Sequence, residues 1–336
     1  MTTTLSKQEP LLNQVSKELN LSIKNVKNVI SLLEEGNTVP FIARYRKEQT
    51  GALDEVQIRN IMDKWNYLQN LEQRKEEVIR LIEEQGKLTE ELAQNIKKAD
   101  KLQMVEDLYR PYKQKRRTKA TVAKEKGLEP LAEWILTFPS NGNLEAEATR
   151  YISEEKEVKT VEEALNGARD IIAEFISDEA SYRDYIRKHT FRKGLIETKV
   201  KKEELDEKRV FEMYYSYQEP IHKVVPHRVL AMNRGEKEDI LKVNIQPDAE
   251  GIQHYLEKQV IKNIHSISTP LVKEAVEDSY KRLIQPSVER EIRNELTDKA
   301  EDQAIHIFSE NLRKLLLQPP MKGKMVLGVD PAFRTG

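Results

Sequence analysis

The spacing of the apolar residues constrains the fold of this chain more than any other feature of its sequence. Ile61, Trp65, Leu68 and Leu71 lie three or four positions apart, and this spacing places them on one face of an α-helix. The same spacing recurs along most of the 336 residues, of which only 12 are Gly and 13 are Pro. That content is too low for many short strands joined by Gly-rich turns. The sequence therefore predicts a mainly α, multi-helical array with minor β content.

Capping and breaking residues predict where the longest helices begin and end. Asp54 and Gln57 have the spacing of a capping box, in which two side chains satisfy free N–H groups at a helix start. They predict a helix that runs to about residue 84. Near the C-terminus, Pro286 is expected to separate one helix from a second, long helix over residues 287–317. At about 1.5 Å per residue, that helix is about 45 Å long.

The N-terminal region has the pattern of a helix-turn-helix element. Two short stretches of helical spacing meet at residues 20–22, which suits two helices joined by a tight turn. In DNA-binding proteins the second helix of such a pair enters the major groove, and Lys24, Lys27 and Asn28 would form its surface here. A helical hairpin that serves only for packing is the preferred interpretation.

Three segments depart from the helical pattern. Residues 195–202 alternate apolar and polar side chains, residues 240–245 are a second short candidate, and residues 325–330 are mostly apolar and β-branched. Alternation and short apolar runs are typical of β-strands. By contrast, Tyr214, Tyr215 and Tyr217 are expected to pack between helices.

The sequence lacks several features, and each missing feature excludes a class of protein. The chain has no Cys, which excludes disulfides, thiolate metal sites and thiol nucleophiles. Its longest run without a charged residue, residues 134–144, is about half of the roughly 20 apolar residues that a membrane-spanning helix needs. The first residues lack the apolar stretch of a secretory signal. A cytoplasmic protein with no membrane partner is expected.

Catalytic and metal-binding motifs are also missing. None of the six His residues lies four positions from another, so no pair of imidazoles shares a helical face to hold zinc. The segment from Gly323 to Gly328 lacks the Lys followed by Ser or Thr that a nucleotide site needs after its second glycine. The sequence predicts no enzyme, no cofactor and no metal site.

Asp330 has two interpretations, one as a metal ligand and one as a side-chain cap on a turn. It closes the predicted strand at residues 325–330, and carboxylates at strand ends hold the metal ions of some nucleases. Two or three such groups must converge on the metals, and only one is present. A side-chain cap on the turn at Pro331 is therefore preferred.

The charge distribution points to nucleic acid, although the net charge is only −1. Residues 110–126 contain eight Lys or Arg and one Glu, and a proline within them favours a loop from which cations can reach phosphates. The candidate contacts are Arg110, Tyr112, Lys113, Lys115, Arg116, Arg117 and Lys119, with Tyr112 as a ring that stacks on an unpaired base. The alternative is an exposed basic loop that pairs with acidic helices.

A second basic stretch spans residues 183–202, with eight Lys or Arg against two acids. Its first part has the pattern of an amphipathic helix, with Tyr182, Ile186 and Tyr185 facing inward. Its cations are expected to form a solvated face.

Four longer strings resemble the bacterial Tex family of RNA-binding transcription accessory proteins. They are GNTVPFIARYRKEQTG (36–51), VEDLYRPYKQKRRT (105–118), PHRVLAMNRGE (226–236) and LGVDPAFRTG (327–336). The resemblance covers nearly the whole chain and keeps the order of the strings in the family. It implies a helical domain over residues 1–200, a central helical scaffold over 201–322, and the first strand of a truncated RNase H-like, YqgF-type domain over 323–336.

The same resemblance implies a function in RNA binding. In the family, helix-hairpin-helix modules and an OB-fold RNA-binding domain follow the RNase H-like domain, whose nuclease site is generally degenerate. We expect a non-enzymatic helical scaffold with an auxiliary, phosphate-contacting loop that binds RNA, with DNA as the other candidate ligand. The alternatives are a scaffold that docks on RNA polymerase or ribosome-associated machinery without touching nucleic acid, and part of a metal-dependent nuclease.

Overall fold

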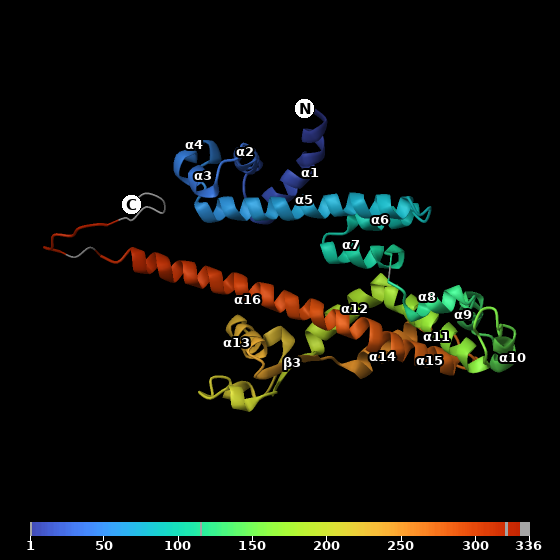
Figure 1. Cartoon of the computed structure of the whole chain (residues 1–336). Helices are drawn as coiled ribbons and strands as arrows, with labels where there is room; N and C mark the ends of the chain where they lie inside the picture. Colours follow the sequence, from blue (N-terminus) through green and yellow to red (C-terminus); the bar gives the residue numbers. More distant parts are fainter. Residues whose placement is uncertain (1, 115, 320–321, 330–336) are drawn as a thin grey trace. The chain divides into compact units, whose positions relative to one another are not determined.

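The computed structural model describes residues 2–114, 116–319 and 322–329. Within these ranges the chain is mainly α-helical (Figure 1) and has one three-stranded sheet, which confirms the predicted fold class. The chain divides into two compact units: residues up to 130 with 151–184, and residues 131–150 with those from 185 onward. The division falls inside helices α9 (Glu129–Leu136) and α12 (Ala180–Lys193). The domain boundaries that the family resemblance implies, after residues 200 and 322, are not tested by this division and stay predictions.

The first apolar core of the first unit lies among its N-terminal helices. These are α1 (Thr2–Leu19), α2 (Ile23–Glu34), α3 (Val39–Tyr45), α4 (Lys47–Thr50) and α5 (Glu55–Glu83). The side chains of Val26, Ile58 and Ile61 are fully buried there, and Trp65 is 4% exposed. The predicted turn at residues 20–22 joins α1 to α2, with the Ser22 hydroxyl accepting the Asn25 N–H at 3.3 Å.

The second apolar core of this unit lies along the other half of α5. Buried side chains of α5, such as Val78 and Ile82, cluster there with Ile96 and Val105. The contributing and following helices are α6 (Glu90–Lys98), α7 (Leu102–Tyr109), the short η1 (Arg110–Tyr112), α8 (Lys119–Glu125) and α11 (Val161–Asp178). Because α5 joins both cores, its start is expected to matter for the stability of the whole unit.

The predicted capping box at the start of α5 is present. The Asp54 carboxylate accepts the Gln57 N–H at 2.8 Å, and the Gln57 side chain accepts the Asp54 N–H at 3.1 Å. Asp54→Ala is expected to lower the free energy of unfolding by about 1 kcal/mol, because the Gln57 N–H loses the carboxylate that accepts it. Urea denaturation checks this, with Asp54→Asn as the control that keeps a capping oxygen. Equal stability of the alanine and asparagine variants would contradict it.

A three-stranded antiparallel sheet forms in the second unit. Its strands are β1 (Leu195–Val200), β2 (Ser216–Pro220) and β3 (Leu241–Gln246), in the order β2-β1-β3. Two strands lie where the sequence predicted them. The side chains of Ile196 and Thr198 are buried along β1, which explains its alternating pattern. The helices that follow are α13 (Pro226–Lys237) and α14 (Ala249–Val260), while α10 (Leu144–Thr149) precedes the sheet in the chain.

The expectation that the tyrosines near residue 215 pack between helices was wrong in part. Tyr217 lies in edge strand β2, where its hydroxyl donates to Glu219 at 2.6 Å. Tyr214 is buried beside it, with the two rings edge to face at 5.4 Å. The strand escaped prediction because it is short and polar and ends in Pro220, as edge strands do.

Pro286 does not separate two helices, contrary to prediction. Helix α15 (Thr269–Asp278) continues through a π-helical turn, η5 (Ser279–Ile284), directly into α16 (Gln285–Leu316). The wider π turn accommodates the residue that cannot donate a backbone hydrogen bond, so the helix continues where a break is expected. The long C-terminal helix itself is confirmed, at 32 residues.

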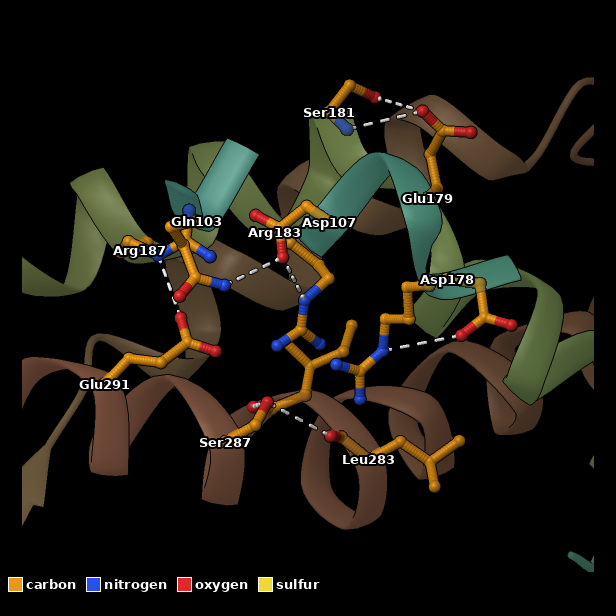
Figure 2. A network of polar contacts seen from close by, with 12 residues as sticks. Gln103, Asp107, Asp178, Glu179, Ser181, Arg183, Arg187, Leu283, Ser287 and Glu291 are labelled. Carbon is orange, nitrogen blue, oxygen red and sulfur yellow. Dashed lines mark hydrogen bonds and ion pairs between the residues drawn. The ribbon is translucent and has the colours of Figure 1, made fainter. Parts of the chain in front are cut away.

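Arg183 corrects the expectation that the second basic stretch forms a solvated face. Its side chain is fully buried in the first unit, where Nε donates to the Asp107 carboxylate at 3.3 Å (Figure 2). Gln103 donates to the same carboxylate at 3.2 Å. A buried guanidinium requires such a partner, and this one lies 76 positions earlier in the sequence, where helical spacing cannot indicate it.

The predicted strand at residues 325–330 is not formed over residues 325–329, and Asp330 lies outside the described residues. A strand needs a neighbour to complete its hydrogen bonds, and none of the described strands pairs with this segment. That it opens a further domain stays a prediction. No helix of the described ranges combines the length and the apolar character that crossing a bilayer requires.

Candidate nucleic-acid interface

The described candidate cations lie on the segment that joins η1 to α8, with Arg110 in η1, Lys113, Arg116 and Arg117 in the predicted loop, and Lys119 as the first residue of α8. Helix η1 ends at Tyr112 and α8 begins at Lys119. The Thr118 hydroxyl closes the loop by accepting the Thr121 N–H at 3.0 Å, which caps α8. We call residues 110–119 the basic loop. Lys115 lies outside the described residues.

The cations at the start of the basic loop have acidic partners. Arg110 lies 3.5 Å from Asp178 and its side chain is 35% exposed. Lys113 lies 4.0 Å from Glu106, but Glu106 also accepts a hydrogen bond from Arg74 at 2.6 Å. That bond, with a second to Glu77, raises the pKa of Arg74 above its usual value. Glu106 is therefore committed mainly to Arg74, and Lys113 remains accessible.

The cations at the end of the basic loop are more exposed. Arg117 lies 3.3 Å from Glu125, with both side chains more than half exposed. Arg116 and Lys119 are exposed, and neither forms an ion pair with an acid of the described residues. The geometry thus divides the candidates into Arg110, which is held by the fold, and four described cations that solvent can reach: Lys113, Arg116, Arg117 and Lys119.

The side chain and the backbone carbonyl of Tyr112 both contact other residues of the first unit. Its side chain is half-buried and packs against the second apolar core, and its carbonyl accepts a hydrogen bond from Gln85 at 2.9 Å. These contacts fix η1 against the end of α5. Stacking of this ring on a base stays a prediction.

A groove of about 680 Å³ lies beside the basic loop in the first unit. One side is formed by Arg117, Thr118 and Lys119, and the other by α11 with Asn166 and Asp170. We call it the loop groove. Sequence reasoning missed it because its lining comes from three segments that are separated along the chain.

The cations of the second basic stretch that lie in the second unit are largely paired within that unit. Arg187 donates to Glu291 at 2.9 Å (Figure 2). Lys201 and Lys202 both bind Asp239, and these hydrogen bonds lower the pKa of Asp239 to about 2. This stretch offers fewer cations for an external phosphate than its composition suggests.

The predicted recognition surface on α2 is also partly used by the fold. Lys24 and Lys27 are exposed, but the Asn28 amide donates to the Gln49 carbonyl at 2.6 Å, which ties α2 to α4. Such a contact suits a packing hairpin, and reading of DNA stays an untested prediction. No group of three or more metal-ligating side chains gathers among the described residues.

Comparison with known proteins finds two family matches. Residues 140–308 match a family described as Tex central region-like, and residues 9–83 match the Tex-like protein N-terminal domain. Together they cover most of the chain.

Similar proteins occur in bacteria and in humans. The chain is 68% identical over 327 residues to an uncharacterized protein of Bacillus subtilis, YdcI, covering 97% of this chain and 46% of that protein. It is 38% identical to the transcriptional accessory protein Tex of Neisseria gonorrhoeae, covering 96% and 43%. It is 30% identical to the S1 RNA-binding domain-containing protein 1 of Homo sapiens, covering 97% and 34%. The chain thus spans less than half the length of these relatives.

Proposed function

The chain belongs to the Tex family, and from this premise we propose that it is a non-enzymatic helical scaffold that contacts RNA phosphates through its basic loop. The printed names of its relatives, a transcriptional accessory protein and an S1 RNA-binding domain-containing protein, support a role that involves nucleic acid. The basic loop is proposed as an auxiliary contact within that role.

The exposure of the loop cations is the observation that carries the proposal. Arg117 and its partner Glu125 are 73% and 55% exposed, and ion pairs this exposed contribute about 0–1 kcal/mol. A phosphate can therefore replace the carboxylate at little cost. Arg116 and Lys119, which lack an acidic partner among the described residues, need not break any pair to bind.

Replacement of the four exposed cations, Lys113, Arg116, Arg117 and Lys119, by Gln tests the proposal. If the loop contacts four phosphates, the wild-type chain should bind a single-stranded RNA with a slope of log affinity against log salt of about −3, because bound cations release counterions. The variant should bind the same RNA more weakly and with a much shallower slope. Fluorescence anisotropy over a salt series measures both quantities.

A matched variant removes four exposed cations from other parts of the first unit: Lys17, Arg59, Lys97 and Lys98. It has the same net charge as the loop variant, so a general effect of charge would lower affinity equally in both. We expect it to retain the wild-type slope. Equal losses in the two variants, or no RNA binding by the wild-type chain at low salt, would refute a contact by the loop.

A protein-interaction scaffold is the second candidate function. The observation in its favour is that Arg110, Lys113 and Arg117 each lie within 4.0 Å of an acidic side chain, as expected for a loop that pairs internally. Absence of RNA binding at low salt favours this candidate, with RNA polymerase or ribosome-associated machinery as the docking partner.

A further inference from the structure

The loop groove has the size and position of a ligand site next to the basic loop. Its volume of about 680 Å³ lies within the range of about 300–1,000 Å³ that is usual for small-molecule sites. All of its lining residues belong to the first unit. Three residues of the basic loop, Arg117, Thr118 and Lys119, line it, so a ligand held by the loop lies next to the loop groove.

The floor of the loop groove is apolar and tightly packed. Leu128 and Val158 are each 1% exposed, and Val122 lies beside them on α8. Gly167 allows α11 to approach this floor, since a Cβ atom there would lie 2.3 Å from the Leu128 side chain and 3.3 Å from Ala123. Val122 is half-buried and is therefore the floor side chain that offers apolar area to a ligand, and apolar side chains of this kind pack against the face of a nucleobase.

The two sides of the loop groove differ in charge. Arg117 and Lys119 line the side of the basic loop, whereas Glu163 and Asp170 line the side of α11. A phosphate is attracted to the first side and repelled from the second, while carboxylates accept hydrogen bonds from the amino groups of bases. Asn166, on α11 between the two acids, adds an amide that can both donate and accept.

We propose that the loop groove holds one unpaired, amino-bearing nucleobase of the RNA strand whose phosphates lie on the basic loop. The base would rest on the floor formed by Val122, Leu128 and Val158, with its amino edge towards Asn166 and the acids of α11. Uracil, which has no amino group, would fit this polarity less well. The proposal rests on the proposed RNA contact and adds to it a preference for particular bases.

Three RNA probes of equal phosphate number test the proposal: oligoadenylate, oligouridylate and an abasic strand, each of about twelve nucleotides. Because the phosphates are the same, the counterion-release slope should be equal for all three. Oligoadenylate should bind about tenfold more tightly than the abasic strand, and oligouridylate should lie between them. Fluorescence anisotropy at fixed low salt gives the three affinities.

Two variants locate the preference in the loop groove. Val122→Phe should fill it and reduce the affinity for oligoadenylate to that for the abasic strand, without changing the salt slope. Asn166→Ala, which adds no bulk, should reduce the difference between oligoadenylate and oligouridylate. Val56→Phe is the matched control, because Val56 is 60% exposed on α5 and does not line the loop groove. Circular dichroism confirms that each variant is folded.

The outcomes separate this proposal from the proposed function. Equal affinity for oligoadenylate and the abasic strand, with a steep salt slope for both, overturns the base site and leaves the phosphate contact intact. A base preference that survives in both groove variants also overturns it. Absence of binding to all three probes at low salt overturns the phosphate contact, and the base site with it.

Discussion

Replacing Asp107 by Ala is expected to lower the free energy of unfolding of the first unit by about 3–5 kcal/mol. The change leaves the Arg183 guanidinium, whose side chain is 0% exposed, without the carboxylate that Nε contacts at 3.3 Å. A buried charge that loses its partner keeps its desolvation penalty and loses the attraction that offset it. Guanidinium denaturation measures the change through the fluorescence of Trp65, which is 4% exposed in this unit, in a background with Trp134→Phe.

A double variant distinguishes the buried charge from a simple loss of packing. Asp107→Leu together with Arg183→Met removes both charges, and much of the lost stability should return, because apolar side chains can replace a buried ion pair. The exposed pair Arg80 and Glu84, 3.8 Å apart with both side chains over 60% exposed, provides the control. Glu84→Ala should change stability by less than about 1 kcal/mol. A similarly small effect of Asp107→Ala would contradict the role assigned to the pair.

Gly194→Ala is expected to destabilise the second unit by about 2–3 kcal/mol, which is the upper range for overpacking of a filled site. Gly194 joins α12 to β1, and a Cβ atom there would lie 2.5 Å from the Thr190 carbonyl oxygen. The backbone cannot move away easily. The Gly194 N–H donates to that same carbonyl at 2.8 Å, and its own carbonyl accepts the Ile221 N–H at 3.1 Å.

Thermal denaturation followed by circular dichroism measures the effect at Gly194. Gly328→Ala is the matched control, because nothing lies within 4 Å of the added methyl group and a surface substitution of this kind changes stability by about 0.5 kcal/mol or less. Equal melting temperatures for the two variants would show that the junction between α12 and β1 tolerates a side chain.

The helices and two strands could be predicted because their signals are local. The capping box of Asp54 and Gln57 lies within one turn of the helix it starts, and alternation along residues 195–202 follows from the buried positions of Ile196 and Thr198. Strand β2 has no such signal, because none of its side chains is fully buried, whereas β3, the other edge strand, buries alternate side chains.

The local density of Lys and Arg was enough to predict the basic loop, but it could not predict the other features of the candidate site. The basic loop follows directly from its composition, and the structure adds that Arg110 is held by Asp178. The loop groove depends on the approach of α8 to α11 at Gly167, which no spacing in the sequence specifies. The burial of Arg183 likewise depends on a residue from another helix.

The π-helical turn at Ser279–Ile284 determines where a residue can be deleted from the continuous helix that α15, η5 and α16 form. A π turn holds one residue more than an α turn, and each residue advances a helix by about 100°. The wider turn absorbs that extra residue, so the buried Val288, Ile292, Leu296 and Ala300, which follow at four-residue intervals, keep their place on one face. Deleting one residue within the turn would restore a regular α turn and leave this face almost in phase, whereas the same deletion at the start of α16 would rotate the face by about 100°.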